Sequence, residues 1–122
     1  MDMDVHTKVF IPDDDFVWVS ALVISSENES HTMQVDDEEY TAKRKPATKV
    51  VSIKDLPPSF HSFPLQNTDL SAEGVDDMCS LNYLHEPSIL DNLMRRFKSQ
   101  LSYTNTGDIC VAVTIVYSYH PF

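Results

Sequence analysis

The stretch "LNYLHEPSILDNLMRRF", Leu81–Phe97, predicts a single amphipathic helix with a defined start. Proline suits the first position of a helix because its missing N–H is one of the donors that a helix start leaves unpaired. Pro87 also moves the preceding residue away from helical backbone angles, so we expect Glu86 to cap the helix. Apolar side chains then recur at helical spacing, and we expect them to form a core face: Leu90, Leu93, Met94, Phe97 and Leu101.

The first part of the chain, residues 1–54, has a strand pattern instead. Residues 16–25 are rich in β-branched and aromatic residues. Further short runs follow at residues 31–35, 39–45 and 48–53, with polar stretches between them. Four or five short strands with no helix pattern favour a small antiparallel β-barrel. Trp18 and Tyr40 are candidates for a peptide-binding groove, but strand aromatics in a small barrel are more often core residues.

Two further segments follow the predicted barrel. Residues 55–74 form a proline-containing linker whose apolar side chains predict that it lies packed along a surface; they are Phe60, Phe63 and Leu65. Residues 75–84 favour a short helical turn ahead of the main helix, and the last part reads as a hairpin turning at Gly107. The predicted fold class is α+β: barrel, linker, amphipathic helix and β-hairpin.

Composition excludes several functional classes. The 122 residues carry a formal net charge of −10, which argues against binding a nucleic-acid backbone or an anionic membrane surface. The start lacks a secretory signal pattern, and the longest apolar runs are shorter than the roughly 20 residues that a spanning helix needs. A cytoplasmic protein is therefore expected.

The sequence offers no catalytic, cofactor-binding or metal-binding set. The five histidines lack metal-site spacing, and we expect Cys79 and Cys110 to be reduced, buried thiols. The acidic runs at residues 13–15 and 36–39 lack the glycine and alternating ligands of a calcium loop. We interpret the basic run 43–45 as balancing those acidic neighbours.

An ordered set of short motifs between residues 75 and 113 resembles the start of the myosin motor domain. It comprises Asp77-Met78, Tyr83-Leu84, Glu86-Pro87, Asn92-Leu93, Arg96, Tyr103-Thr104, Gly107 and Val111-Ala112-Val113. The run at residues 17–25 is similar to part of the Src-homology-3-like barrel that precedes many myosin motors. The resemblance implies three domains: a barrel (1–54), the linker (55–74) and an incomplete start of a P-loop motor domain (75–122).

The resemblance breaks after Val113. The family continues there with an Asn that opens the adenine loop, but this chain has Thr114. No phosphate-loop motif occurs in the 122 residues, since the only glycines are Gly74 and Gly107. We interpret the departure at residues 114–122 as a truncated or mis-spliced reading frame.

Two functions remain open at this point. The resemblance implies the N-terminal part of an actin-based, ATP-driven motor of the cytoskeleton, with ATP and Mg²⁺ used by the complete protein and not by this chain. In that case the chain is inactive alone, and the rest of the motor packs on helix 86–101 and strand 109–117. The alternative is a stand-alone interaction module, which predicts a stable protein without exposed apolar surface.

Overall fold

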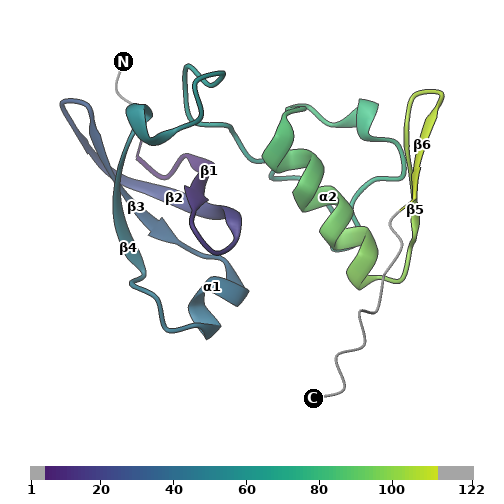
Figure 1. Cartoon of the computed structure of the whole chain (residues 1–122), viewed down its shortest axis with the longest axis horizontal. Helices are drawn as coiled ribbons and strands as arrows, with labels where there is room; N and C mark the ends of the chain where they lie inside the picture. The colour runs from purple at the N-terminus through teal and green to yellow at the C-terminus, as the bar shows by residue number, and fades with distance from the viewer. Residues whose placement is uncertain (1–4, 113–122) are drawn as a thin grey trace. The chain divides into compact units, whose positions relative to one another are not determined.

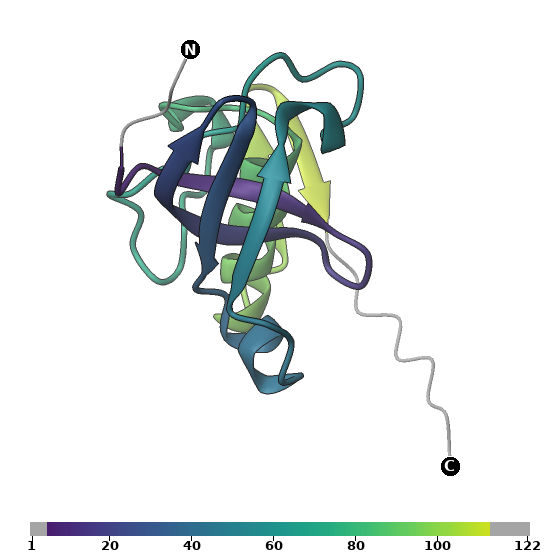
Figure 2. The same cartoon turned by 90° about the vertical axis from the view of Figure 1, so that its left-hand side faces the viewer.

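The computed structural model describes residues 5–112 (Figure 1). The chain divides into two compact units, Met1–Thr68 and Asp69–Phe122. The first unit contains strands β1 (Lys8–Asp13), β2 (Val17–Glu27), β3 (Ser30–Val35) and β4 (Thr48–Ser52). They form one antiparallel sheet in the order β1-β2-β3-β4. The sheet is twisted, so that β1 (purple) runs across β4 (teal) in Figure 2.

The core of the first unit follows largely from alternation along these strands. Most inward-facing residues are odd-numbered and oppose one another across the sheet, as in the pairs Val9↔Ala21 and Val23↔Met33, and the even-numbered Phe10 and Trp18 are buried as well. A bulge between Val23 and Ser25 shifts the register, and beyond it His31 lies opposite Ser26. Ser26 Oγ and His31 Nδ1 are 2.8 Å apart, which satisfies a histidine that is only 2% exposed.

Residues 39–45 do not form the expected strand. Helix α1 (Glu38–Ala42) occupies most of this run, because Asp37 caps it by accepting from the Tyr40 N–H at 3.1 Å. Glu38 and Glu39 add negative charge to the first turn, where the helix dipole favours it. Tyr40 is buried and donates its hydroxyl to Pro46 O at 2.7 Å, so it is a core residue and not part of an exposed groove.

The linker packs against the sheet, as its apolar residues predict. After the short 3-10 helix η1 (Ile53–Asp55), Leu56 and Phe63 are buried in the core. Phe60 meets the buried Trp18 edge-on, with ring centroids 5.2 Å apart. Trp18 is therefore also a core residue, and the peptide-groove interpretation of the two aromatics is wrong.

The sheet does not close into a barrel by strand pairing within the described residues. β1 and β4 are its two edges, and no ladder joins them. The edge of β1 is instead covered by the linker, because the Phe10 N–H donates to Pro64 O and the Gln66 N–H donates to Lys8 O. What stands of the predicted barrel is its small antiparallel sheet.

The second unit contains the 3-10 helix η2 (Met78–Ser80), helix α2 (Glu86–Lys98) and strands β5 (Tyr103–Thr106) and β6 (Ile109–Ala112). η2 lies within the predicted helical turn at 75–84. β5 and β6 pair antiparallel around Gly107, which has φ +62° and suits a tight turn. The continuation of the predicted strand from Val113 to Tyr117 lies outside the described residues.

Candidate functional site

Helix α2 begins one residue earlier than the sequence pattern suggests. Its cap is His85 and not Glu86: His85 has extended backbone angles, and its Nδ1 accepts from the Ser88 N–H at 3.2 Å. In return, the Ser88 hydroxyl oxygen accepts from the His85 N–H at 3.0 Å. Pro87 still lies in the first turn, where its missing N–H costs nothing.

The buried side of α2 is polar. Ser88, Asn92 and Arg96, four residues apart along one face, are 1%, 0% and 9% exposed. Burying such groups is unfavourable unless each is hydrogen-bonded. Asn92 meets this condition by binding the backbone of Val75 on both sides: the Val75 N–H donates to Asn92 Oδ1 at 2.8 Å, and Asn92 Nδ2 donates to Val75 O at 3.0 Å.

Gly74 makes this approach possible. A Cβ at residue 74 would collide with the side-chain oxygen of Asn92, and the backbone there has φ +71°. Glycine is the residue that takes this conformation without strain. The segment before η2 is thus held against α2 by main-chain hydrogen bonds to one buried amide.

Arg96 holds the hairpin in the same way. Its Nε donates to Thr104 Oγ1 at 2.8 Å, and its Nη2 donates to Tyr103 O at 2.8 Å. Arg96 forms no ion pair with a carboxylate among residues 5–112. Hydrogen bonds to Tyr103 O and Thr104 Oγ1 therefore stabilise this nearly buried guanidinium.

The β5–β6 turn has a second anchor at Asp77. Asp77 Oδ1 accepts from the Cys79 N–H at 3.0 Å and from the Gly107 N–H at 3.1 Å. These two backbone donors hold the pKa of the Asp77 carboxyl below its ordinary value. Asn105 also donates its N–H to Asp76 O at 2.7 Å, so the hairpin is fixed to the segment before η2.

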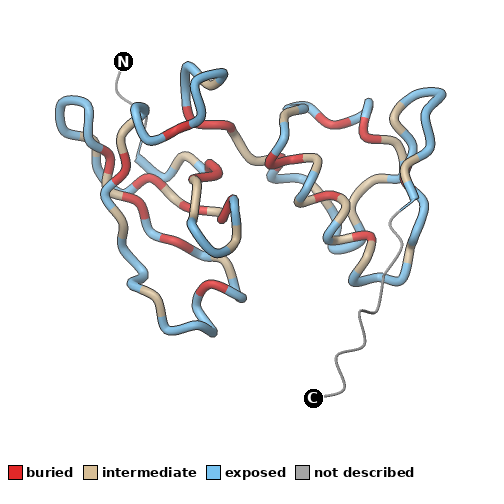
Figure 3. Tube along the Cα trace, viewed as in Figure 1, coloured by how far each residue is buried: buried red, intermediate tan, exposed pale blue. Residues whose placement is uncertain are grey.

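The apolar stripe of α2 is not a core face within this unit, and its predicted burial against the rest of a motor stays a prediction. Leu90 and Met94 are 45% and 47% exposed, and Leu93 and Phe97 are only half-buried. The reason is that the contacts within this unit use the polar face described above. Other large apolar side chains of the unit are also exposed: Tyr83, Leu84, Tyr103 and Ile109. Figure 3 shows buried positions on α2 as short intervals between exposed and intermediate ones.

The remaining site predictions have mixed outcomes. Cys79 and Cys110 are free, but both are exposed, so the expectation of buried thiols is wrong; the hairpin that carries Cys110 has little cover in this unit. Thr114, at the family's adenine-loop position, lies outside the described residues. Within residues 5–112 no group of three or more acidic, histidine or cysteine side chains is placed to hold a metal ion. No helix there is long and apolar enough to cross a membrane.

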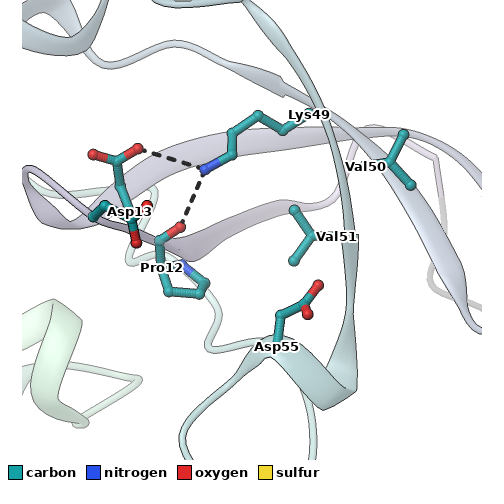
Figure 4. Close-up of a pocket in the computed structure, with 7 residues that line it drawn as sticks. Pro12, Asp13, Lys49, Val50, Val51 and Asp55 are labelled. Carbon is teal, nitrogen blue, oxygen red and sulfur yellow. Dashed lines mark hydrogen bonds and ion pairs between the residues drawn. The ribbon is translucent and has the colours of Figure 1, made fainter.

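The acidic and basic runs of the first unit meet at Asp13. Lys45 Nζ lies 3.1 Å from Asp13 Oδ2 and 2.6 Å from Asp15 Oδ2, which agrees with a charge-balancing role for the basic run. Lys49 Nζ lies 3.5 Å from Asp13 Oδ1 (Figure 4). Burial raises the pKa of Asp13, but hydrogen bonds from Lys45 and from the backbone of Asp15 and Phe16 outweigh it, so the net pKa lies below 3.8.

Sequence reasoning missed the three polar residues of α2. Asn92 and Arg96 were noted as parts of a motif, but no structural role was assigned to them. A signal was available, because Ser88, Asn92 and Arg96 recur every four residues and therefore share a helix face. Because the polar side of α2 is the buried one, its apolar stripe is left largely uncovered within this unit.

Comparisons with known proteins show which proteins the chain is similar to. The chain is 37% identical to Myosin-15 of Arabidopsis thaliana over 107 residues, which are 87% of this chain and 6% of that protein. It is 30% identical to Myosin-16 of the same plant over 109 residues, 89% of this chain and 8% of the relative. It is 35% identical to the Myosin-J heavy chain of Dictyostelium discoideum over 106 residues, 86% of this chain and 4% of the relative. No protein-family model matches the chain.

These similarities confirm the resemblance recognised in the sequence: the chain belongs to the myosin heavy chains. It spans less than a tenth of the length of the three relatives named above. The activities of the complete relatives therefore do not follow for this chain from the similarity alone.

Proposed function

We propose that this chain is the N-terminal part of an actin-based, ATP-driven motor and that its own contribution is structural. The relationship to the myosin heavy chains supports the motor assignment, and with it a place on the cytoskeleton and in a myosin complex. Actin filaments, ATP and Mg²⁺ are then partners of the complete motor. This chain carries no phosphate-loop motif with which to bind the nucleotide itself.

The observation that carries the structural role is that α2 buries its polar face and leaves its apolar face exposed. Polar side chains of the helix hold Val75 and Thr104 inside the unit, and the apolar stripe with Leu90 and Met94 is left for other residues to cover. We expect the rest of the motor to pack on helix 86–101 and on strand 109–117. The uncompensated charge of Arg96 favours a carboxylate on the covering surface.

In this structural role, the β5–β6 hairpin would position the residues that follow β6. In the family the residues after β6 lead to the adenine loop, so the position of β6 affects where that loop begins. Arg96 and Asp77 fix the hairpin through Thr104 and Gly107. They would act as positioning residues, with no contact to nucleotide.

Exposed apolar surface distinguishes this function from a stand-alone interaction module. The purified chain is titrated with a dye that fluoresces on exposed apolar surface, beside a Leu90→Glu/Met94→Glu double variant. We expect strong fluorescence from the wild type and a clear decrease in the variant, with equal helix content by circular dichroism. A Leu90→Met/Met94→Leu variant is the matched control, because it keeps the apolar area and should keep the fluorescence.

The contrary result has a definite meaning. A wild-type chain that is monodisperse and binds no dye would favour the stand-alone module. A second titration, with fluorescent ATP and Mg²⁺, should show no binding. Saturable binding would mean that these residues build a nucleotide site of their own and would contradict the structural role.

A further inference from the structure

The β4 edge of the first unit has backbone groups directed away from the sheet. In an antiparallel pair, alternate residues direct their N–H and C=O groups toward the partner strand. The Val35 N–H donates to Ala47 O, so in register Lys49 and Val51 face β3. Thr48 and Val50 therefore direct their N–H and C=O groups outward, where no further strand pairs with β4 within the described residues.

β1, the other edge strand, cannot form a full hydrogen-bonded ladder with β4 at Pro12. The same alternation places Pro12 of β1 on the outward side, and proline has no N–H to donate. A lysine side chain links the two edge strands in place of backbone pairing. Lys49 Nζ of β4 donates to Pro12 O of β1 at 3.4 Å and contacts Asp13 (Figure 4). An open groove of about 240 Å³ lies here, lined by Pro12, Asp13, Asp14, Lys49, Val50, Val51 and Asp55.

The chemistry of the groove selects its occupant. Three carboxylates and one ammonium line it, and the single cation, Lys49, already contacts Asp13. Asp14 and Asp55 are exposed and form no ion pair among residues 5–112. Val50 adds an apolar side chain that is 67% exposed, and the whole chain carries a net charge of −10. An occupant needs extended backbone, positive charge and a small apolar contact.

We propose that the β4 edge binds an extended segment of a partner protein that carries lysine or arginine, by strand addition in this groove. Main-chain groups of the segment pair with the outward groups of Thr48 and Val50. Its basic side chains meet the carboxylates of Asp14 and Asp55. This mode takes affinity from backbone pairing and selectivity from side chains. The proposal concerns the first unit alone and does not depend on the motor assignment.

The test measures binding of two labelled peptides to the whole 122-residue chain by fluorescence anisotropy. One peptide alternates valine and lysine, and the other has glutamate in place of lysine. We expect weak, saturable binding of the lysine peptide, weakening as salt screens the charges, and no binding of the glutamate peptide. Hydrogen exchange should slow at the amides of Thr48 and Val50 when the lysine peptide is bound.

Variants at two residues separate backbone pairing from charge attraction. Val50→Pro removes the outward N–H without touching the β3 ladder and should weaken binding about fivefold, the effect of one lost hydrogen bond. Val50→Thr keeps that N–H and the branched shape and should bind as the wild type does. Asp14→Lys should weaken binding of the lysine peptide and strengthen binding of the glutamate peptide. This variant still tests the proposal if Val50→Pro fails to fold.

Four results would overturn the proposal. They are no binding of the lysine peptide, equal binding of both peptides, unchanged binding in both Val50→Pro and Asp14→Lys, and a concentration-dependent dimer of the chain that Val50→Pro abolishes. The last result would assign the edge to a second copy of this chain instead of a basic segment.

Discussion

Replacement of Asn92 by alanine tests the polar support of α2 directly. Asn92 is fully buried and makes two hydrogen bonds with the Val75 backbone, at 2.8 and 3.0 Å. Each is worth about 0.5–1.5 kcal/mol of net stability, so their loss costs about 1–3 kcal/mol. Alanine has the higher helix propensity and returns up to about 0.7 kcal/mol. The expected net destabilisation is about 1–2 kcal/mol.

The assay is hydrogen exchange of the whole chain, read at the Val75 amide and along α2. A destabilisation of this size speeds exchange about 5- to 30-fold where opening is local. The control is Asp91→Ala, at the residue before Asn92. This change gains a similar helix propensity and loses only the partly exposed ion pair with Arg95. That pair is worth about 0.3–0.5 kcal/mol. If Asn92→Ala exchanges no faster than Asp91→Ala, Asn92 does not hold the Val75 segment and the reasoning fails.

Three further predictions concern the turn, the ion cluster and the cap. Gly74→Ala should destabilise the second unit by about 1–3 kcal/mol, because alanine is strained at φ +71° and its Cβ meets Asn92. Gly107→Ala, at φ +62° but with only Cys79 Sγ at 3.7 Å, should cost less in the same denaturation experiment; an equal cost would exclude the collision. Asp13 has a lowered pKa in the folded protein, so its stabilising contribution is present above pH 3.8 and is lost as pH falls through the folded pKa. The fluorescence of Trp18 should show this acid loss of stability, reduced in Asp13→Asn and retained in Asp14→Asn; the same acid response in both variants would contradict it. Asp37→Ala should cost about 1 kcal/mol by removing the cap of α1, whereas Asp36→Ala, at an exposed neighbour, should change unfolding little; equal effects in thermal unfolding would refute the cap assignment.

Local pattern was sufficient for most elements. Alternation predicts β2, β3 and β4, and a turn at Gly107 predicts the hairpin. β1 was not resolved as a separate run, because Pro12 and Asp13 interrupt its apolar residues. The prediction of a strand at 39–45 is wrong: Tyr40 and Thr41 are residues common in strands, but the capping hydrogen bond of Asp37 favours a helix here.

Periodicity shows which side of a helix is apolar, but not whether the same unit covers it. The stripe of α2 was therefore found correctly, and its burial against other parts of a larger protein stays a prediction. The burial of Ser88, Asn92 and Arg96 depends on partners far along the sequence, at Val75 and Thr104. The contact between Lys49 and Pro12 is equally non-local. It depends on the register of the edge strands β1 and β4, which are about 40 residues apart along the chain.

The two units show different uses of burial. The first unit encloses an apolar core, which is non-directional and stabilises it without further partners. The second unit relies on directional hydrogen bonds from Asn92 and Arg96, which fix where the Val75 segment and the hairpin lie. Met78 and Leu81 are buried in it, but the exposed side chains of the α2 stripe contribute little until they are covered. Full burial of a leucine or methionine is worth about 1.5–3 kcal/mol, so covering the exposed half of Leu90 and Met94 would add about 0.7–1.5 kcal/mol each. Polar contacts thus set the geometry of this unit, and most of the stability available to its apolar stripe is supplied by whatever packs against it.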